Sequence, residues 1–369
     1  SGFSKLSKSE KRYLKVQQGS GEKDYLTLLD ALLAQKQFDE NQFIKDNNGA
    51  NFLKNLSVNK RYLYEIILKS LANFGEKTLE DQVFERISAT NVLIDKGLYK
   101  AAFNELKKGL KITEKYELFE LQIMLLGIEK KLRAMRQFKT TNKKDSSTSI
   151  FEAEKNALAQ LMNTNEYWYL NHKIAQFQMK HQKIQSEAQR EFITPFINNT
   201  KFQDENLATN IKSKIFYFQL NATYQFMLGN VSKAYENNQK FLDYLESKAH
   251  FLKLYAERYL ATLNNLLIDS FGMGKYDQIE EGIIRLDKIP ERKEFKGIKN
   301  INSRVFRQKY LLLLNWNLRQ QAFQKAADLI PEIEIGLEKF GNTIEKHHRI
   351  TFYYLCAYVL FINKVVLYF

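Results

Sequence analysis

The 369-residue chain has few residues that interrupt helices and little of the chemistry that supports redox or metal sites. It contains three prolines, 15 glycines and one cysteine. So few prolines allow long, unbroken helices, and a single cysteine excludes an internal disulfide. Cys356 stands in an apolar stretch, Tyr-Leu-Cys-Ala, and we therefore expect a small buried side chain and not a reactive thiol.

Long hydrophobic runs are also missing. The most apolar window covers residues 352–362, whereas a transmembrane helix needs about 20 residues. The first residues lack the apolar core of a secretory signal, so we expect a cytoplasmic protein with no membrane partner. The chain ends on Val-Val-Leu-Tyr-Phe369. A helical array needs a polar surface on its last repeat, so this apolar end predicts a chain truncated within a repeat or covered by a partner.

No constellation of catalytic or metal-binding residues can be found. There is no Gly-x-Ser-x-Gly elbow, and Gly-Met-Gly-Lys-Tyr at 272–276 lacks the flanking residues of a phosphate loop. His172 and His181 are nine positions apart, which places them on opposite faces of a helix. His347 and His348 are adjacent, so their side chains diverge and do not share a metal. We expect a non-enzymatic protein without cofactor or metal.

What the chain does contain is a turn pattern, Gly-x-aromatic-x-x-Ala, that recurs between amphipathic stretches. It occurs at Gly97, in related forms at Gly229 and Gly274, weakly at Gln321, and again at Asn363. The last four positions are separated by 45, 47 and 42 residues, and the first step is 132, three times 44. This period predicts one helical hairpin per repeat, with two degenerate copies between the first two anchors.

Local signals divide the chain further. Residues 1–74 predict four helices, the last over 51–74, and thus a small N-terminal helical domain at 1–75. An array at 76–369 follows, with helices near 79–95, 99–113 and 116–137 and a polar loop at 139–148. Further helices are expected to start at Ser149 and at Asn163, and the region from Pro195 to about 204 is expected to be irregular. No strand pattern is evident.

The repeat units resemble the tetratricopeptide repeat superfamily. The matching residues are Leu93, Gly97, Tyr99 and Ala102, then Phe218, Ala222, Gly229 and Ala234, then Leu263, Leu267, Gly274 and Tyr276. The resemblance covers about residues 78–369 and implies an all-α fold, a right-handed α-α superhelix. The period exceeds the usual ~34 residues, which suggests elongated helices. An armadillo-like or HEAT-like solenoid is the alternative.

The resemblance also implies a function, a scaffold that binds a peptide or partner protein in a concave groove. Carrying the groove positions of the family onto this chain selects Asn91, Phe216, Gln219, Thr223, Phe226, Asn264, Ile268, Gln308 and Asn315. Amide side chains at these positions are suited to hydrogen-bond a peptide backbone without demanding a sequence. The basic residues with which some members of the family hold a C-terminal carboxylate are missing there.

The net charge of +14 favours a second hypothesis, a transcriptional regulator whose N-terminal domain binds nucleic acid while the array senses a peptide. In layout the chain resembles peptide-responsive regulators with tetratricopeptide-like repeats. The candidate nucleic-acid-binding residues are Lys54, Asn59, Lys60, Arg61 and Lys69. However, residues 1–74 carry a net charge of only +4, with no helix-turn-helix signature. A basic cluster between Lys130 and Lys144 is interpreted as a helix end and a solvated loop.

Overall fold

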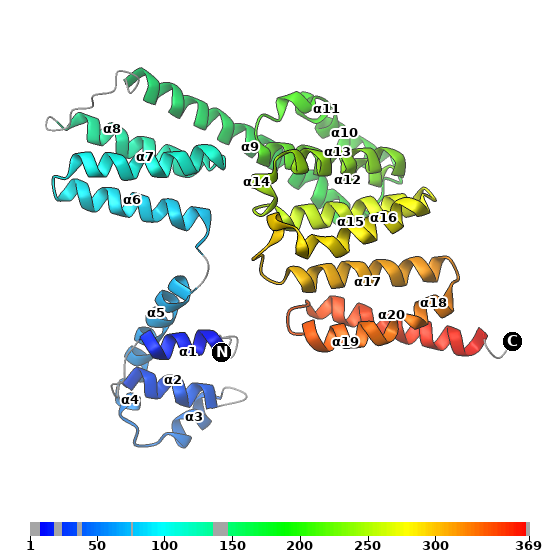
Figure 1. Cartoon of the computed structure of the whole chain (residues 1–369), viewed down its shortest axis with the longest axis horizontal. Coiled ribbons are helices and arrows are strands. Elements are labelled where there is room, and N and C mark those ends of the chain that lie inside the picture. The colour runs from blue at the N-terminus through cyan, green and yellow to red at the C-terminus, as the bar shows by residue number, and fades with distance from the viewer. Residues whose placement is uncertain (1–7, 18–23, 35–38, 75–76, 136–146, 367–369) are drawn as a thin grey trace. The chain divides into compact units, whose positions relative to one another are not determined.

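The computed structural model describes residues 8–17, 24–34, 39–74, 77–135 and 147–366. Every regular element in these ranges is a helix, and no strand occurs in them (Figure 1). The expected all-α class is therefore confirmed. The chain divides into two compact units, Ser1–Glu85 and Arg86–Phe369, and this boundary lies ten residues beyond the position expected from the sequence.

The first unit is a small cluster of helices around an apolar core. Leu28, Phe43 and Leu63 are fully buried there. The single helix expected over 51–74 is divided at Asn55, whose backbone leaves the helical conformation (φ −132°, ψ 47°). The helices are α1 (Lys8–Gln17), α2 (Asp24–Ala34), α3 (Glu40–Asp46), α4 (Asn51–Lys54), α5 (Leu56–Phe74) and the beginning of α6 (Leu79–Asp95).

The second unit continues as a series of helices. Its elements are α7 (Tyr99–Lys115), α8 (Phe119–Ala134), α9 (Ser147–His181), α10 (Glu187–Ile197), α11 (Thr200–Gln203), η2 (Glu205–Leu207), α12 (Ile211–Met227), α13 (Val231–Ser247), α14 (Ala249–Leu252), α15 (Ala256–Gly272), α16 (Tyr276–Lys288), η3 (Ile289–Glu291), η4 (Lys293–Phe295), α17 (Ile301–Arg319), α18 (Phe323–Asp328), α19 (Ile330–Phe340) and α20 (Lys346–Val366).

The recurring turns of the sequence share one backbone conformation. Gly97, Gly229 and Gly274 have φ values of 72°, 77° and 69°, and Gln321 has 55°. In each turn the next backbone N–H donates to the carbonyl five residues earlier, at 2.8–2.9 Å, which closes the preceding helix as a Schellman motif. Glu117 (φ 53°) makes the same turn between α7 and α8. The sequence pattern missed it because glutamate stands where glycine is usual.

Three local expectations were wrong. Asn163 does not begin a helix but lies within the continuous α9, where its amide contacts Leu207 and Thr209. Pro195 is not in an irregular region, because α10 continues to Ile197 around it. Asn363 forms no turn, since α20 runs on to Val366 and the Asn363 amide donates to Gln324.

The last helix also departs from expectation in its burial. Cys356 is half-buried rather than buried, and that burial raises the pKa of its thiol. The outer face of α20 exposes apolar side chains, with Tyr354 67% and Phe361 68% exposed.

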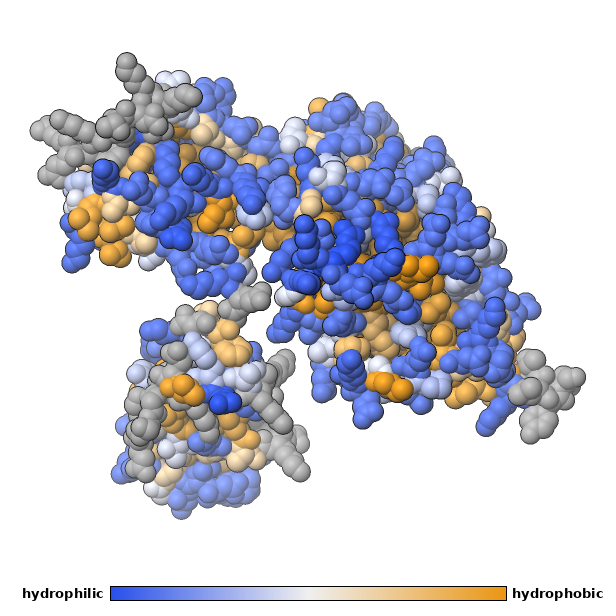
Figure 2. Space-filling model, in the orientation of Figure 1, coloured by the Kyte–Doolittle hydropathy of each residue, from blue (hydrophilic) through white to orange (hydrophobic). Residues whose placement is uncertain are grey.

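Consecutive helices pack in order along the chain. α12 packs against α9 and α13, α13 against α15, and α15 against α16 and α17 (Figure 1). Leu220, Leu242 and Leu263 are fully buried in the core shared by these helices. In the part of the chain that the structure describes, no helix has the length and apolarity to cross a bilayer. The face of residues 86–369 shown in Figure 2 is mainly hydrophilic, with separate hydrophobic areas.

Candidate functional site

Two adjoining hollows lie on the second unit. The first, of about 400 Å³, is lined by α9, α12, α13 and α15. The second, of about 440 Å³, is lined by α15, α17 and the beginning of α20. Both include Ala261, Asn265 and Ile268 of α15. The two hollows are therefore continuous across α15, and we refer to them together as the groove.

Most of the groove residues expected from the sequence line these hollows. Gln219, Thr223 and Phe226 line the first, Asn264, Gln308 and Asn315 line the second, and Ile268 lines both. Phe216 instead packs against the core, and Asn91 is exposed on α6. Neither of these two residues lines the groove.

Contacts at both ends show that α15 and α17 run in the same direction along the second hollow. Near their first turns, Arg304 forms an ion pair with Glu257 at 2.6 Å. Near their last turns, the Arg319 guanidinium lies 4.8 Å from the centre of the Phe271 ring. The lining residues of α17 extend over 12 positions, about 18 Å of helix. This length suits an extended segment of several residues.

The side-chain amides of the groove differ in their hydrogen bonding. Gln219 accepts a hydrogen bond from Arg258 at 3.3 Å, and Asn315 donates to the Leu311 carbonyl at 2.7 Å. The side-chain oxygen of Gln308 is buried and has no donor within the described structure. A buried acceptor without a donor costs about 1–3 kcal/mol. An N–H group in the second hollow would remove that cost.

Charged side chains are distributed unequally between the two hollows. The second contains Arg307, Arg319 and His348 and no acidic lining residue. Arg307 forms an ion pair with Glu345 at 2.8 Å. Burial and the neighbouring Arg307 lower the pKa of His348, so this side chain is mainly neutral at pH 7.

The first hollow contains a buried carboxylate that the sequence reasoning missed. Asp269 of α15 is 5% exposed and accepts a hydrogen bond from the Asn238 amide of α13 at 2.7 Å. Burial raises its pKa to about 6. The sequence did contain a signal for this burial. Asp269 lies seven positions after Thr262 and three after Leu266, and therefore on the same helix face as these two buried residues.

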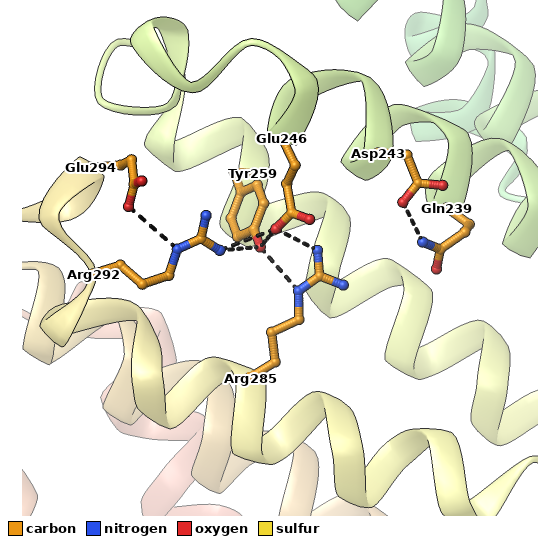
Figure 3. A network of polar contacts seen from close by, with 7 residues as sticks. All are labelled: Gln239, Asp243, Glu246, Tyr259, Arg285, Arg292 and Glu294. Atoms are coloured by element: carbon orange, nitrogen blue, oxygen red, sulfur yellow. Dashed lines mark hydrogen bonds and ion pairs between the residues drawn. The ribbon is translucent and has the colours of Figure 1, made fainter.

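A polar network on another side of α15 holds the surrounding helices together. The Tyr259 hydroxyl donates to Glu246 of α13 at 2.7 Å and accepts from Arg285 of α16 at 3.0 Å (Figure 3). Arg292 donates to the same Glu246 oxygen at 3.1 Å. Burial alone raises the pKa of Glu246, but hydrogen bonds from Tyr259 and Arg292 lower it overall. The network positions α13 and α15, which line the first hollow.

The nucleic-acid candidates of the first unit are partly occupied by contacts within the chain. Lys60 pairs with Glu40 at 2.5 Å, Arg61 pairs with Glu65 at 3.2 Å, and the Asn59 amide donates to the Phe52 carbonyl at 3.1 Å. Lys54 and Lys69 are exposed, on α4 and α5 respectively. These contacts do not favour a shared phosphate-binding surface, so the regulator hypothesis stays a prediction.

The basic cluster near residue 130 also engages acids where the structure describes it. Lys130 binds Glu154 at 2.7 Å and Arg133 binds Glu129 at 2.7 Å. Lys131 is exposed on α8. The part of the cluster from Arg136 to Lys144, and the polar loop expected at 139–148 apart from its last two residues, lie outside the described residues. Residues 147 and 148 belong to α9.

The ring centres of His347 and His348 lie 3.9 Å apart, so the expectation that these side chains diverge was wrong. His172 stacks on Trp168, and the His181 ring contacts the Gln189 amide at 3.1 Å. Among the described residues, no three histidine, cysteine, aspartate or glutamate side chains gather as metal ligands would.

No protein-family model matches this chain, and no curated protein or solved structure matches it. The geometry of the groove is therefore the basis for inferring the function of this protein.

Proposed function

We propose that the second unit is a tetratricopeptide-like, right-handed superhelical scaffold that binds an extended segment of a partner protein in the groove. The observation that carries this proposal is that seven of the nine residues selected by repeat position line two continuous hollows. Repeat positions that are far apart in sequence would not converge in this way on an unrelated arrangement of helices. The matching turns at Gly97, Gly229, Gly274 and Gln321 support the same repeat.

The chemistry of the groove suits a peptide more than a compact small molecule. Gln308 offers a buried acceptor, and the neighbouring Asn264 and Asn265 place two more side-chain amides along the second hollow. Such groups can pair with the N–H and C=O groups of an extended backbone. Apolar anchors at Ile268 and Trp316 provide surface for side chains of the ligand.

To test the proposal, random linear peptides are selected for binding to the full chain. The affinity of the selected peptides is then measured for two variants. Ile268 is 47% exposed in the groove, and Ile284 is 54% exposed on α16, where it lines neither hollow. Ile268→Arg places a charged side chain where both hollows meet, so we expect at least a tenfold loss of affinity. Ile284→Arg is the matched control and should bind as the parent does.

Circular dichroism establishes that both variants are folded. If the selected peptides bind the Ile268→Arg variant as tightly as the parent, the groove is not the binding surface.

A further inference from the structure

The first hollow holds a negative charge without a positive partner. Asp269 is 5% exposed, and among the described residues its carboxylate accepts a hydrogen bond from the neutral Asn238 amide. No cation of the described residues contributes to its electrostatic environment. A buried carboxylate without a cation is costly, and this one lines an open hollow of about 400 Å³. Such a group can be completed by a ligand.

We propose that Asp269 is the anchor for a cationic side chain, lysine or arginine, of the peptide bound in the groove. This inference rests on the proposed function and adds the chemistry that the ligand must carry. The charge of the ligand would replace the positive partner that the folded chain does not supply.

The surroundings of Asp269 favour a cation over an anion or a neutral group. The other residues that line this hollow from α9, α12 and α13 are uncharged. Arg258, the other charged lining residue, lies eleven positions earlier on α15, about 16 Å along the helix. α16 and α17 pack on α15 but contribute no lining residue here. Asp269 also lies in the last turn of α15, where the helix dipole adds partial negative charge.

The remainder of the hollow suits the aliphatic part of a basic side chain. Phe226 and Ile268 are 39% and 47% exposed at its rim. Ala234 and Phe241 are buried, with only 1% and 3% of their surface exposed. The methylene groups of lysine and arginine pack on apolar surface while the charged end reaches a polar partner. The second hollow has only basic charged side chains in its lining, so it would not accept the same group.

The test selects random linear peptides on the full chain and on the Asp269→Asn variant. Asparagine keeps the shape and can still accept from Asn238, but it carries no charge. The matched control is Asp243→Asn, because Asp243 also accepts an amide hydrogen bond, from Gln239 at 2.7 Å, and is exposed outside the groove (Figure 3). Melting curves show that each variant folds.

We expect the parent and the Asp243→Asn variant to select peptides with a lysine or arginine at one shared position. Replacing that residue by glutamine should weaken binding to the parent at least tenfold, and binding to the Asp269→Asn variant less than twofold. Lowering the pH from about 7 to about 5 should weaken only the parent and the Asp243→Asn control, because Asp269 becomes protonated.

Two other outcomes overturn the inference in different ways. Tight peptides without a shared basic residue, bound equally by the Asp269→Asn variant, would refute the anchor and leave the peptide groove intact. Selection of no peptide at all by the parent chain would refute the proposed function and the anchor together.

Discussion

Replacing the buried Asp269 by asparagine should make the protein more stable at neutral pH. Burial raises the pKa of Asp269 from its ordinary value of 3.8 to about 6. A rise of about 2 pH units corresponds to about 3 kcal/mol of differential stability. Because the folded protein holds this proton more tightly than the unfolded chain, the free energy of unfolding falls as the pH rises from about 4 to about 6. Above that range the full cost is present.

Asparagine does not ionise, so the Asp269→Asn variant avoids this loss. We expect it to exceed the parent in free energy of unfolding by up to about 3 kcal/mol at pH 7.5, and to match it near pH 4. Urea titrations followed by circular dichroism at several pH values measure the difference, and titrations of other carboxylates cancel in it. The exposed Asp243→Asn variant is the control and should change stability little at either pH.

The reasoning is refuted if the advantage of the Asp269→Asn variant is the same at pH 4 and pH 7.5, or if the variant is less stable at neutral pH. Either result would mean that the charge of Asp269 is already compensated in the unliganded protein.

Four further changes test the packing, a turn and the polar network, each by denaturant unfolding. Gly336→Ala should destabilise by about 1–3 kcal/mol, because the new methyl group meets the Phe306 ring. Gly127→Ala, whose methyl group meets nothing within 4 Å, should instead stabilise by about 0.5–1 kcal/mol. Gln321→Gly should stabilise by about 0.5–1 kcal/mol, since glycine adopts its φ of 55° without strain. Tyr259→Phe should cost about 1–3 kcal/mol by leaving the buried network around its hydroxyl incomplete.

These expectations have clear contrary results. Equal effects at Gly336 and Gly127 would mean that the Phe306 ring moves freely, and a loss of stability in the Gln321→Gly variant would argue against a strained turn. Unchanged stability of the Tyr259→Phe variant would show that water replaces its hydroxyl in the network.

Features that depend on neighbouring residues were predictable. Helices α6 and α7 and the hairpins α12–α13 and α15–α16 follow apolar spacing and turn glycines, both of which act within a few residues. The errors arose where a local signal was ambiguous. Asn163 matches a helix start but bonds to Leu207 and Thr209, 44 and 46 positions away, and Glu117 makes a turn that glycine usually makes.

The sequence by itself determined the all-helical class and the repeating turn, because both follow from local backbone geometry and helical period. The groove positions came from the family resemblance, and two of the nine, Phe216 and Asn91, do not line the hollows. Only the tertiary structure decided which of these positions matter chemically. The burial of Asp269 beside Asn238, 31 residues earlier, and the pairing of Lys60 with Glu40 result from packing between separate helices. The charge state of a side chain depends on the solvent and partners that such packing removes or supplies, and no short stretch of sequence contains that information.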